Sequence, residues 1–122
     1  MKKIFTLSTI SLFAILLFSA CTKRTYIDND ENYWLSKERG EVVYSSSSCS
    51  FYVVQTYNGY TVINSTDGYR PFEGSIVYGN FSSHGIHDFY NYSNDVIITG
   101  DVRDYWLSYA EAQTAVDYYC YY

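Results

Sequence analysis

Runs of β-branched and aromatic residues between polar positions, from residue 41 onward, predict short β-strands, and the clearest of them form a hairpin. Residues 50–57 and 60–64 are two runs rich in Val, Ile, Thr and Tyr, which are the residue types that favour strands. The dipeptide Asn58-Gly59 between them is a preferred sequence for a type I′ turn. The register set by this turn joins three pairs of residues: Tyr57 with Tyr60, Gln55 with Val62, and Val54 with Ile63. The last pair is expected to face the core.

The rest of the chain adds shorter strands and one helix. The strands are expected at residues 41–44, 75–81, 86–90 and 95–102. The helix is expected from Ser108 to about Tyr119, because residues 108–111 have the Ser-x-x-Glu form of a capping box. This order predicts an α+β fold: a small antiparallel β-sheet or partly closed barrel of about five to six strands with a C-terminal helix. An oligosaccharide/oligonucleotide-binding type of barrel is one such architecture, although its helix between the third and fourth strands is missing.

A short repeat flanks the predicted strands. The tetrapeptide Tyr-Trp-Leu-Ser occurs at residues 33–36 and again at residues 105–108. The simpler interpretation is that both Trp-Leu pairs pack at helix starts and help to fill one core. The alternative is a matched pair of tryptophans that stack on a ligand.

The N-terminal residues have the pattern of an export signal. Lys2 and Lys3 precede an apolar run over residues 4–18, which is shorter than the roughly 20 apolar residues of a transmembrane helix. Small residues then stand before Cys21, as they do at a signal cleavage site. These features favour secretion over a membrane-spanning helix.

Residues 17–21, Leu-Phe-Ser-Ala-Cys, resemble the lipobox of bacterial lipoproteins. The resemblance implies that Cys21 becomes the first residue and carries a thioether-linked diacylglycerol and usually an N-acyl chain such as palmitate. Two or more acyl chains hold a protein on a membrane essentially permanently. Thr22 stands where the family's inner-membrane retention signal has Asp, so the outer membrane is favoured. Ordinary cleavage after Ala20, which leaves Cys21 as a free thiol, is the alternative.

This interpretation divides the chain into three parts. They are a signal peptide at residues 1–20, a polar tether at residues 21–32 and a single β-rich domain at residues 33–122. The tether has few apolar residues and is expected to have little order. We therefore expect a protein of the bacterial cell envelope that contacts the membrane through the lipid on Cys21.

The charge balance excludes one class of partner. The chain holds 8 basic and 13 acidic residues, and two of the basic residues, Lys2 and Lys3, lie in the signal. Removal of residues 1–20 therefore leaves a formal net charge of −7. Nucleic acid is not an expected partner, because phosphate binding needs a basic surface.

Tyrosine is unusually abundant. All 16 tyrosines follow Cys21, which is more aromatic surface than a small domain can bury completely. One interpretation is that Tyr serves as a strand residue with good β-propensity. The other is an exposed aromatic surface that binds an envelope protein or polysaccharide. The aromatic residues expected to be exposed in loops, and so to bind, are Tyr69, Phe72, Tyr90 and Tyr92.

The cysteines predict one disulfide. With Cys21 lipidated, Cys49 and Cys120 form an even pair in an oxidising compartment. A bond between them encloses most of the domain and ties the end of the helix to the start of the hairpin. A catalytic thiol is the weaker interpretation, because no partner base stands near either cysteine in the sequence.

The chain offers little catalytic chemistry. His84 and His87, with Asp88 beside them, have a spacing that can share a metal ion, but Gly85 disfavours a helix there and no third ligand has a fixed spacing. No catalytic residue, metal site or cofactor is therefore predicted. The expected function is a non-catalytic binding or structural module of the cell envelope. The alternatives are a small metal-dependent hydrolase built on the His84–Asp88 loop and an inhibitor or immunity-type lipoprotein.

Overall fold

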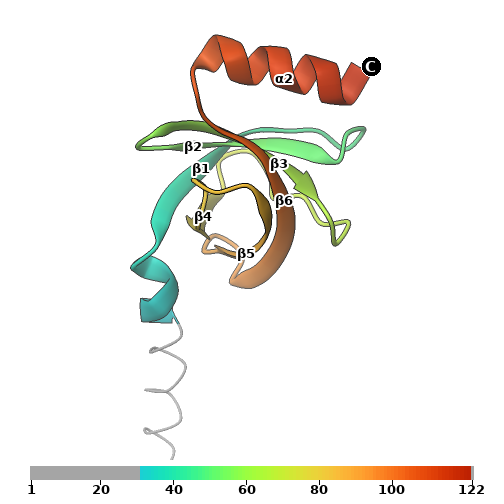
Figure 1. Ribbon diagram of the computed structural model, residues 1–122. Coiled ribbons are helices and arrows are strands. Elements are labelled where there is room, and N and C mark those ends of the chain that lie inside the picture. Colours follow the sequence, from blue (N-terminus) through green and yellow to red (C-terminus); the bar gives the residue numbers. More distant parts are fainter. Residues whose placement is uncertain (1–30, 122) are drawn as a thin grey trace, which may run out of the picture. The chain divides into compact units, whose positions relative to one another are not determined.

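The computed structural model describes residues 31–121, which contain a six-stranded barrel with one helix packed on its outside (Figure 1). The elements in chain order are β1 (Glu38–Ser45), β2 (Phe51–Thr56), β3 (Gly59–Ser65), β4 (Ile76–Gly79), β5 (Gly85–Asn91), β6 (Val96–Leu107) and α2 (Tyr109–Tyr121). Residues 31–35 are also helical. The barrel and α2 belong to one compact unit, Trp34–Tyr122. The predicted α+β class with a C-terminal helix is confirmed, and of the predicted alternatives, a small antiparallel sheet or a barrel of five to six strands, the structure has a barrel of six.

Several sequence-based predictions lie outside the described residues. They are the signal peptide at residues 1–20, the lipidated Cys21 and the tether as far as residue 30. Within residues 31–121, no helix is long and apolar enough to cross a membrane.

The sheet closes completely, which corrects the expectation of a partly closed barrel. Neighbouring strands follow the order β1-β2-β3-β6-β5-β4, and β1 pairs with β4 to close it, with Glu38 opposite Gly79 and Glu41 opposite Ile76. This closure uses the polar first half of β1, which carries no apolar alternation in the sequence. A closed barrel has no free strand edge on which another chain can pair.

The hairpin of β2 and β3 is present, but its predicted register is wrong by two residues. Thr56 lies opposite Gly59, so the turn consists of Tyr57 and Asn58. The Thr56 hydroxyl accepts a hydrogen bond from the Asn58 N–H (3.1 Å) and donates one to the Gly59 carbonyl (3.2 Å). These bonds stabilise the turn at its observed position. A displacement of two residues preserves which side chains face the barrel interior.

Gly59 is not part of the turn, where the sequence predicted it, but is the first residue of β3. Its φ is +130°, and a Cβ at this position would lie 2.7 Å from the carbonyl oxygen of Leu107 on β6. Gly59 therefore allows the hairpin backbone to approach β6 closely, which any side chain would prevent.

The barrel interior holds the main core. Val54 and Ile63 face it, as predicted, together with Phe81 and Phe89, whose stacked rings have centroids 4.9 Å apart. Gly79 makes room for these rings, because a Cβ there would lie 2.4 Å from the Phe89 ring. The interior is therefore filled by side chains.

A second core lies between α2 and the outer face of the barrel. Its buried members are Val53, Val62, Ala112 and Val116. The helix presents only small and medium apolar residues here, so it covers a narrow strip of β2 and β3. Space remains beside that strip, and it forms the groove described below.

Both ends of α2 are fixed as predicted. At the start, the Ser108 N–H donates to Glu111 Oε1 (3.0 Å) and the Glu111 N–H donates to Ser108 Oγ (3.2 Å), which confirms the capping box. At the other end, Cys120 forms a disulfide with Cys49, with their Cα atoms 5.6 Å apart. The disulfide attaches the last turn of α2 to the start of β2.

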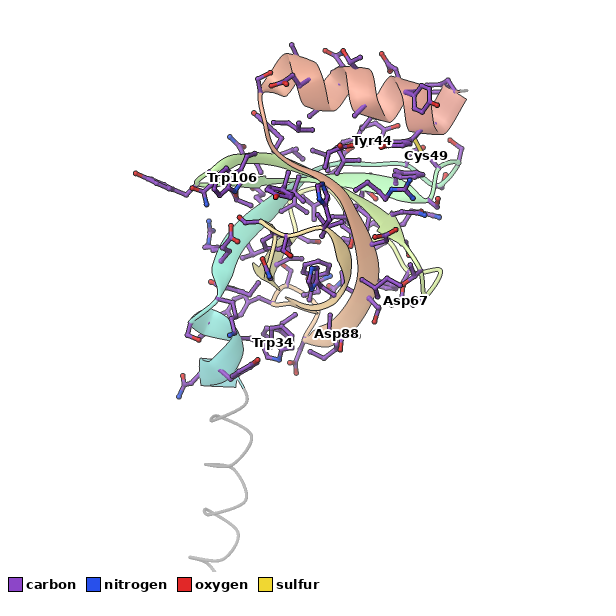
Figure 2. All side chains as sticks on the ribbon, in the orientation of Figure 1. Trp34, Tyr44, Cys49, Asp67, Asp88 and Trp106 are labelled. Atoms are coloured by element: carbon purple, nitrogen blue, oxygen red, sulfur yellow. A yellow bond between two sulfur atoms is a disulfide. The ribbon has the colours of Figure 1, made fainter. Side chains whose placement is uncertain are left out.

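The two Tyr-Trp-Leu-Ser segments do not fill one core, which corrects the simpler interpretation. Trp34 is half-buried, and its ring centroid lies 6.3 Å from that of Tyr90. Trp106 lies near the end of β6 with a φ of +57° and is 59% exposed. Its Nε1 donates a hydrogen bond to Ser82 Oγ at 2.8 Å. Figure 2 shows the two tryptophans on different parts of the fold.

Candidate functional site: a groove beneath the C-terminal helix

The histidine loop considered for metal chemistry is engaged in structural contacts. The His84 ring lies against Tyr105, with centroids 4.8 Å apart. His87 Nε2 donates to the Ser83 carbonyl at 3.1 Å. Asp88 Oδ1 accepts a hydrogen bond from a threonine hydroxyl on β6 at 2.8 Å. Within residues 31–121, no group of three or more His, Cys, Asp or Glu side chains could hold a metal ion.

The four aromatic residues expected in an exposed surface have different environments. Phe72 and Tyr92 are 74% and 48% exposed. Tyr69 is half-buried against the barrel core. Tyr90 is only 7% exposed, and its hydroxyl donates to Asp95 Oδ1 at 2.7 Å. The prediction that Tyr90 is exposed is therefore wrong, because β5 extends through it and its ring packs against Trp34.

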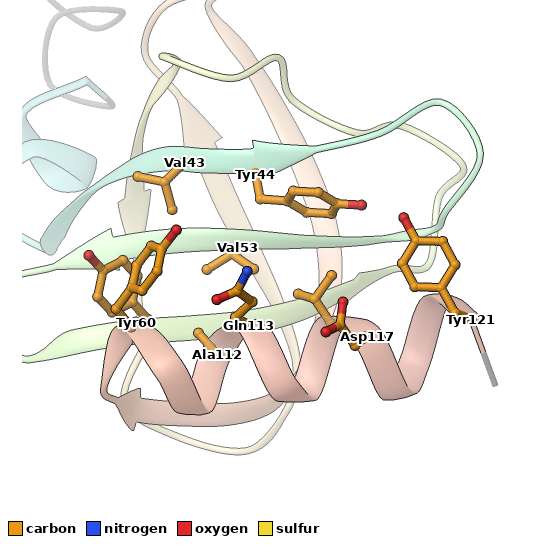
Figure 3. Close-up of a pocket in the computed structure, with 10 residues that line it drawn as sticks. Val43, Tyr44, Val53, Tyr60, Ala112, Gln113, Asp117 and Tyr121 are labelled. Atoms are coloured by element: carbon orange, nitrogen blue, oxygen red, sulfur yellow. The ribbon is translucent and has the colours of Figure 1, made fainter.

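A groove of about 200 Å³ lies between α2 and the outer faces of β1, β2 and β3 (Figure 3). Its apolar lining residues are Val43, Val53, Ala112 and Val116. Its tyrosines are Tyr44, Tyr60, Tyr109 and Tyr121, and its other polar residues are Gln113 and Asp117. An apolar floor with a few polar groups at its rim is the usual composition of a small-ligand site.

A β-bulge in β1 supplies one wall of the groove. Val42 lies opposite Val54, but the next pair is Tyr44 with Val53, so Val43 is an extra residue on this strand. A bulge of this kind re-aims side chains that regular alternation would send to opposite faces. Here Val42 stays in the barrel core, whereas Val43 and Tyr44 both line the groove.

The far wall comes from α2 and is held in place at both ends. Near its start, the Tyr109 ring meets the Tyr60 ring edge to face, with centroids 5.8 Å apart. Near its end, Tyr119 stacks on Phe51 with centroids 4.4 Å apart, next to the disulfide at Cys120. These contacts fix the distance between helix and sheet, so the groove is formed without a ligand.

One end of the groove is electrically negative. Asp117 is exposed there, and among residues 31–121 no Lys, Arg or His lines the groove. Burial, hydrogen bonding to Tyr121 and the charge of Asp117 all raise the pKa of the Tyr44 hydroxyl. That hydroxyl is therefore neutral at physiological pH and can donate or accept a hydrogen bond. The site offers aromatic faces, hydroxyls and one carboxylate.

The groove contains none of the four aromatic residues expected to bind. Its position depends on the bulge in β1, which the apolar run of Val42, Val43 and Tyr44 does not locate, because such a run also fits a regular buried strand. The one signal in the sequence is the narrow apolar stripe of α2, since a helix with small residues at Ala112 and Val116 cannot cover a sheet flanked by large tyrosines.

Comparisons of this chain with protein-family models, curated proteins and solved structures find no match.

Proposed function

We propose that this chain is a lipid-anchored, non-catalytic binding module of the bacterial cell envelope and that its ligand occupies the groove beneath α2. The observation that carries the proposal is the groove itself, with its four tyrosines and apolar floor. Tyr side chains provide a large contact area with little loss of conformational freedom, and they are enriched in recognition sites.

The rigidity of the site supports binding. The barrel is closed, and α2 is tied to it by the disulfide and by the ring stack of Phe51 and Tyr119. A site that is already formed loses less conformational entropy on binding than a flexible loop, which the ligand would have to order. The cavity of about 200 Å³ has room for one side chain or a group of similar size. The groove is therefore suited to bind one such group of a larger partner.

Two observations support the proposed location in the cell envelope: the lipobox resemblance and the disulfide. The lipobox resemblance implies a lipid on Cys21, and disulfides such as Cys49–Cys120 persist mainly in oxidising compartments. Both support an envelope location, with the outer membrane favoured by Thr22. A protein or a polysaccharide of the envelope is the proposed partner.

The hydrolase alternative has no support in the geometry of its loop. His84 packs on Tyr105, and His87 donates to the backbone of Ser83, so the two rings serve separate local contacts. No specific contact favours an inhibitor or immunity role over a general binding role.

The proposal is tested with two matched variants of the full chain in the native bacterium. Gln113→Trp places a large ring at the rim of the groove, whereas Thr114→Trp places the same ring at the next, exposed position of α2, outside the groove. Complexes are fixed in intact cells by a general crosslinker and compared on gels. We expect the same complex with the wild-type chain and Thr114→Trp, and its loss with Gln113→Trp. Equal recovery with both variants, or no complex with the wild-type chain, would contradict the proposal.

A further inference from the structure

We propose that the group bound in the groove beneath α2 is the cationic side chain of a lysine or arginine on a partner polypeptide. This inference rests on the proposed binding function and specifies its ligand. It follows from the charge at one end of the groove, from the aromatic lining and from the shape of the apolar floor.

The end of the groove beside the C-terminus of α2 carries negative charge. The helix C-terminus carries a partial negative charge from its free carbonyl groups, and proteins usually place Lys or Arg there. The last turn of α2 has no basic residue, and Asp117 lies close to it. A cation bound at this end therefore compensates the Asp117 carboxylate and the partial negative charge of the helix end, and among residues 31–121 no basic side chain in the groove lining does so.

The aromatic lining of the groove also suits a cation. Figure 3 shows Tyr44 and Tyr121 with their hydroxyls toward one another at the end of the groove that also holds Asp117. A tyrosine ring attracts a cation to its face, and a neutral hydroxyl oxygen accepts a hydrogen bond from an ammonium or guanidinium group. An anionic ligand would meet the same carboxylate without any basic side chain to bind it.

The apolar floor of the groove suits the stem of a long side chain. Val43, Val53 and Val116 line the groove, and Figure 3 shows Val53 between Tyr60 at one end and Tyr121 at the other. Lys and Arg carry their charge on an apolar stem that packs well against such surfaces. A small inorganic cation would leave this floor unused, whereas a side chain covers the floor and places its charge at Asp117.

The other side of the same helix already holds such an arrangement within the chain. The Arg103 guanidinium lies over the Tyr119 ring, 5.7 Å from its centroid, and its Nη1 is 3.6 Å from Asp101 Oδ2. A cation, a tyrosine of α2 and a carboxylate thus combine there. In the groove, Asp117 and Tyr121 supply the carboxylate and the ring, and among residues 31–121 no basic side chain lines it, so we assign the cation to a partner.

The test is an NMR titration of the isotopically labelled full chain, kept soluble in a nonionic detergent. The probes are Nα-acetyl-lysine methylamide, Nα-acetyl-arginine methylamide and the neutral Nα-acetyl-norleucine methylamide, which keeps the lysine stem without its charge. We expect both cations to bind roughly fivefold more tightly than norleucine, in line with one partly exposed ion pair and one cation–π contact. Asp117→Asn is expected to remove most of this difference.

Asp101→Asn is the matched control, because it removes the same charge outside the groove. It should leave the affinity for the lysine probe unchanged. Equal binding of lysine and norleucine, no binding of any probe, or an equal effect of Asp101→Asn and Asp117→Asn would overturn the inference. If Gln113→Trp still abolishes the crosslinked complex in that case, the binding function stands and only the ligand class is wrong.

Discussion

Replacing both Cys49 and Cys120 with serine is expected to lower the free energy of unfolding by about 4 kcal/mol. The two cysteines are 71 residues apart in the chain, so their bond closes a loop that spans most of the barrel and α2. In the chain-entropy model, the loss of such a long closed loop gives the unfolded chain this much additional freedom. For a domain whose total stability is about 5–15 kcal/mol, the change is a large fraction.

Thermal unfolding followed by near-ultraviolet circular dichroism measures the effect. A domain of this size has an unfolding entropy that converts 4 kcal/mol into a fall in Tm of roughly 20 °C. The variant should also bind the lysine probe less tightly, because the C-terminal end of α2 is then held to β2 only by contacts such as the stack of Phe51 on Tyr119.

Cys21→Ser is the matched control for the double variant. It also exchanges a cysteine for a serine, but it leaves the closed loop intact, so its Tm should equal that of the wild-type chain. A loss of less than about 1 kcal/mol in the double variant would contradict this prediction, since the disulfide would then contribute little beyond the packing around it.

Three further predictions concern the core, the acid stability and the anchor. Gly79→Ala should lower stability by about 1–3 kcal/mol in urea unfolding, because the added Cβ would lie 2.4 Å from the Phe89 ring; an unchanged midpoint would contradict this. Partial burial raises the pKa of Asp67, but hydrogen bonds from Thr99, Tyr69 and Ser65 outweigh it and lower the pKa below its ordinary value of 3.8. The stability this carboxylate supplies is therefore present above that value and is lost as the pH falls below it, so Asp67→Asn should lose less stability than the wild-type chain between pH 5 and pH 2; identical pH profiles would count against the assignment. In the native bacterium, radiolabelled palmitate should enter the wild-type chain and not Cys21→Ser, and equal labelling of both would disprove lipidation at this residue.

Local signals in the sequence were sufficient for most elements of the fold. The runs of β-branched and aromatic residues predict the strands, the Ser-x-x-Glu pattern predicts the start of α2, and the cysteine pair predicts the disulfide. Each of these depends on residues within a few positions of each other, or on the redox chemistry of a single pair. Closure of the barrel could not be predicted in the same way, because residues 38–41 are polar and pair with β4 only through the tertiary fold.

The turn of the hairpin shows how a tertiary contact overrides a local preference. Asn58-Gly59 favours a two-residue turn, but Gly59 is needed where the hairpin approaches Leu107 on β6. The turn therefore moves to Tyr57 and Asn58, where Thr56 provides the stabilising hydrogen bonds. The pattern of inward and outward side chains survives because the shift is an even number of residues.

The candidate site could not be predicted from the sequence for a related reason. Val43 and Tyr44 line the same groove only because a bulge interrupts the alternation of β1. Tyr90, in contrast, stands at the end of the strand predicted at residues 86–90, but β5 continues to Asn91 and Tyr90 is buried. Abundance of tyrosine therefore predicts a recognition surface without showing which tyrosines form it.

Photocrosslinking from the groove in intact cells shows whether a ligand binds beneath α2. The photoreactive residue p-benzoylphenylalanine is placed at Gln113, on the rim of the groove, and separately at Phe72, which is exposed on the loop between β3 and β4. A ligand bound beneath α2 predicts a covalent adduct of defined mass from position 113 and none from position 72. An adduct from position 72 without one from position 113 would contradict it.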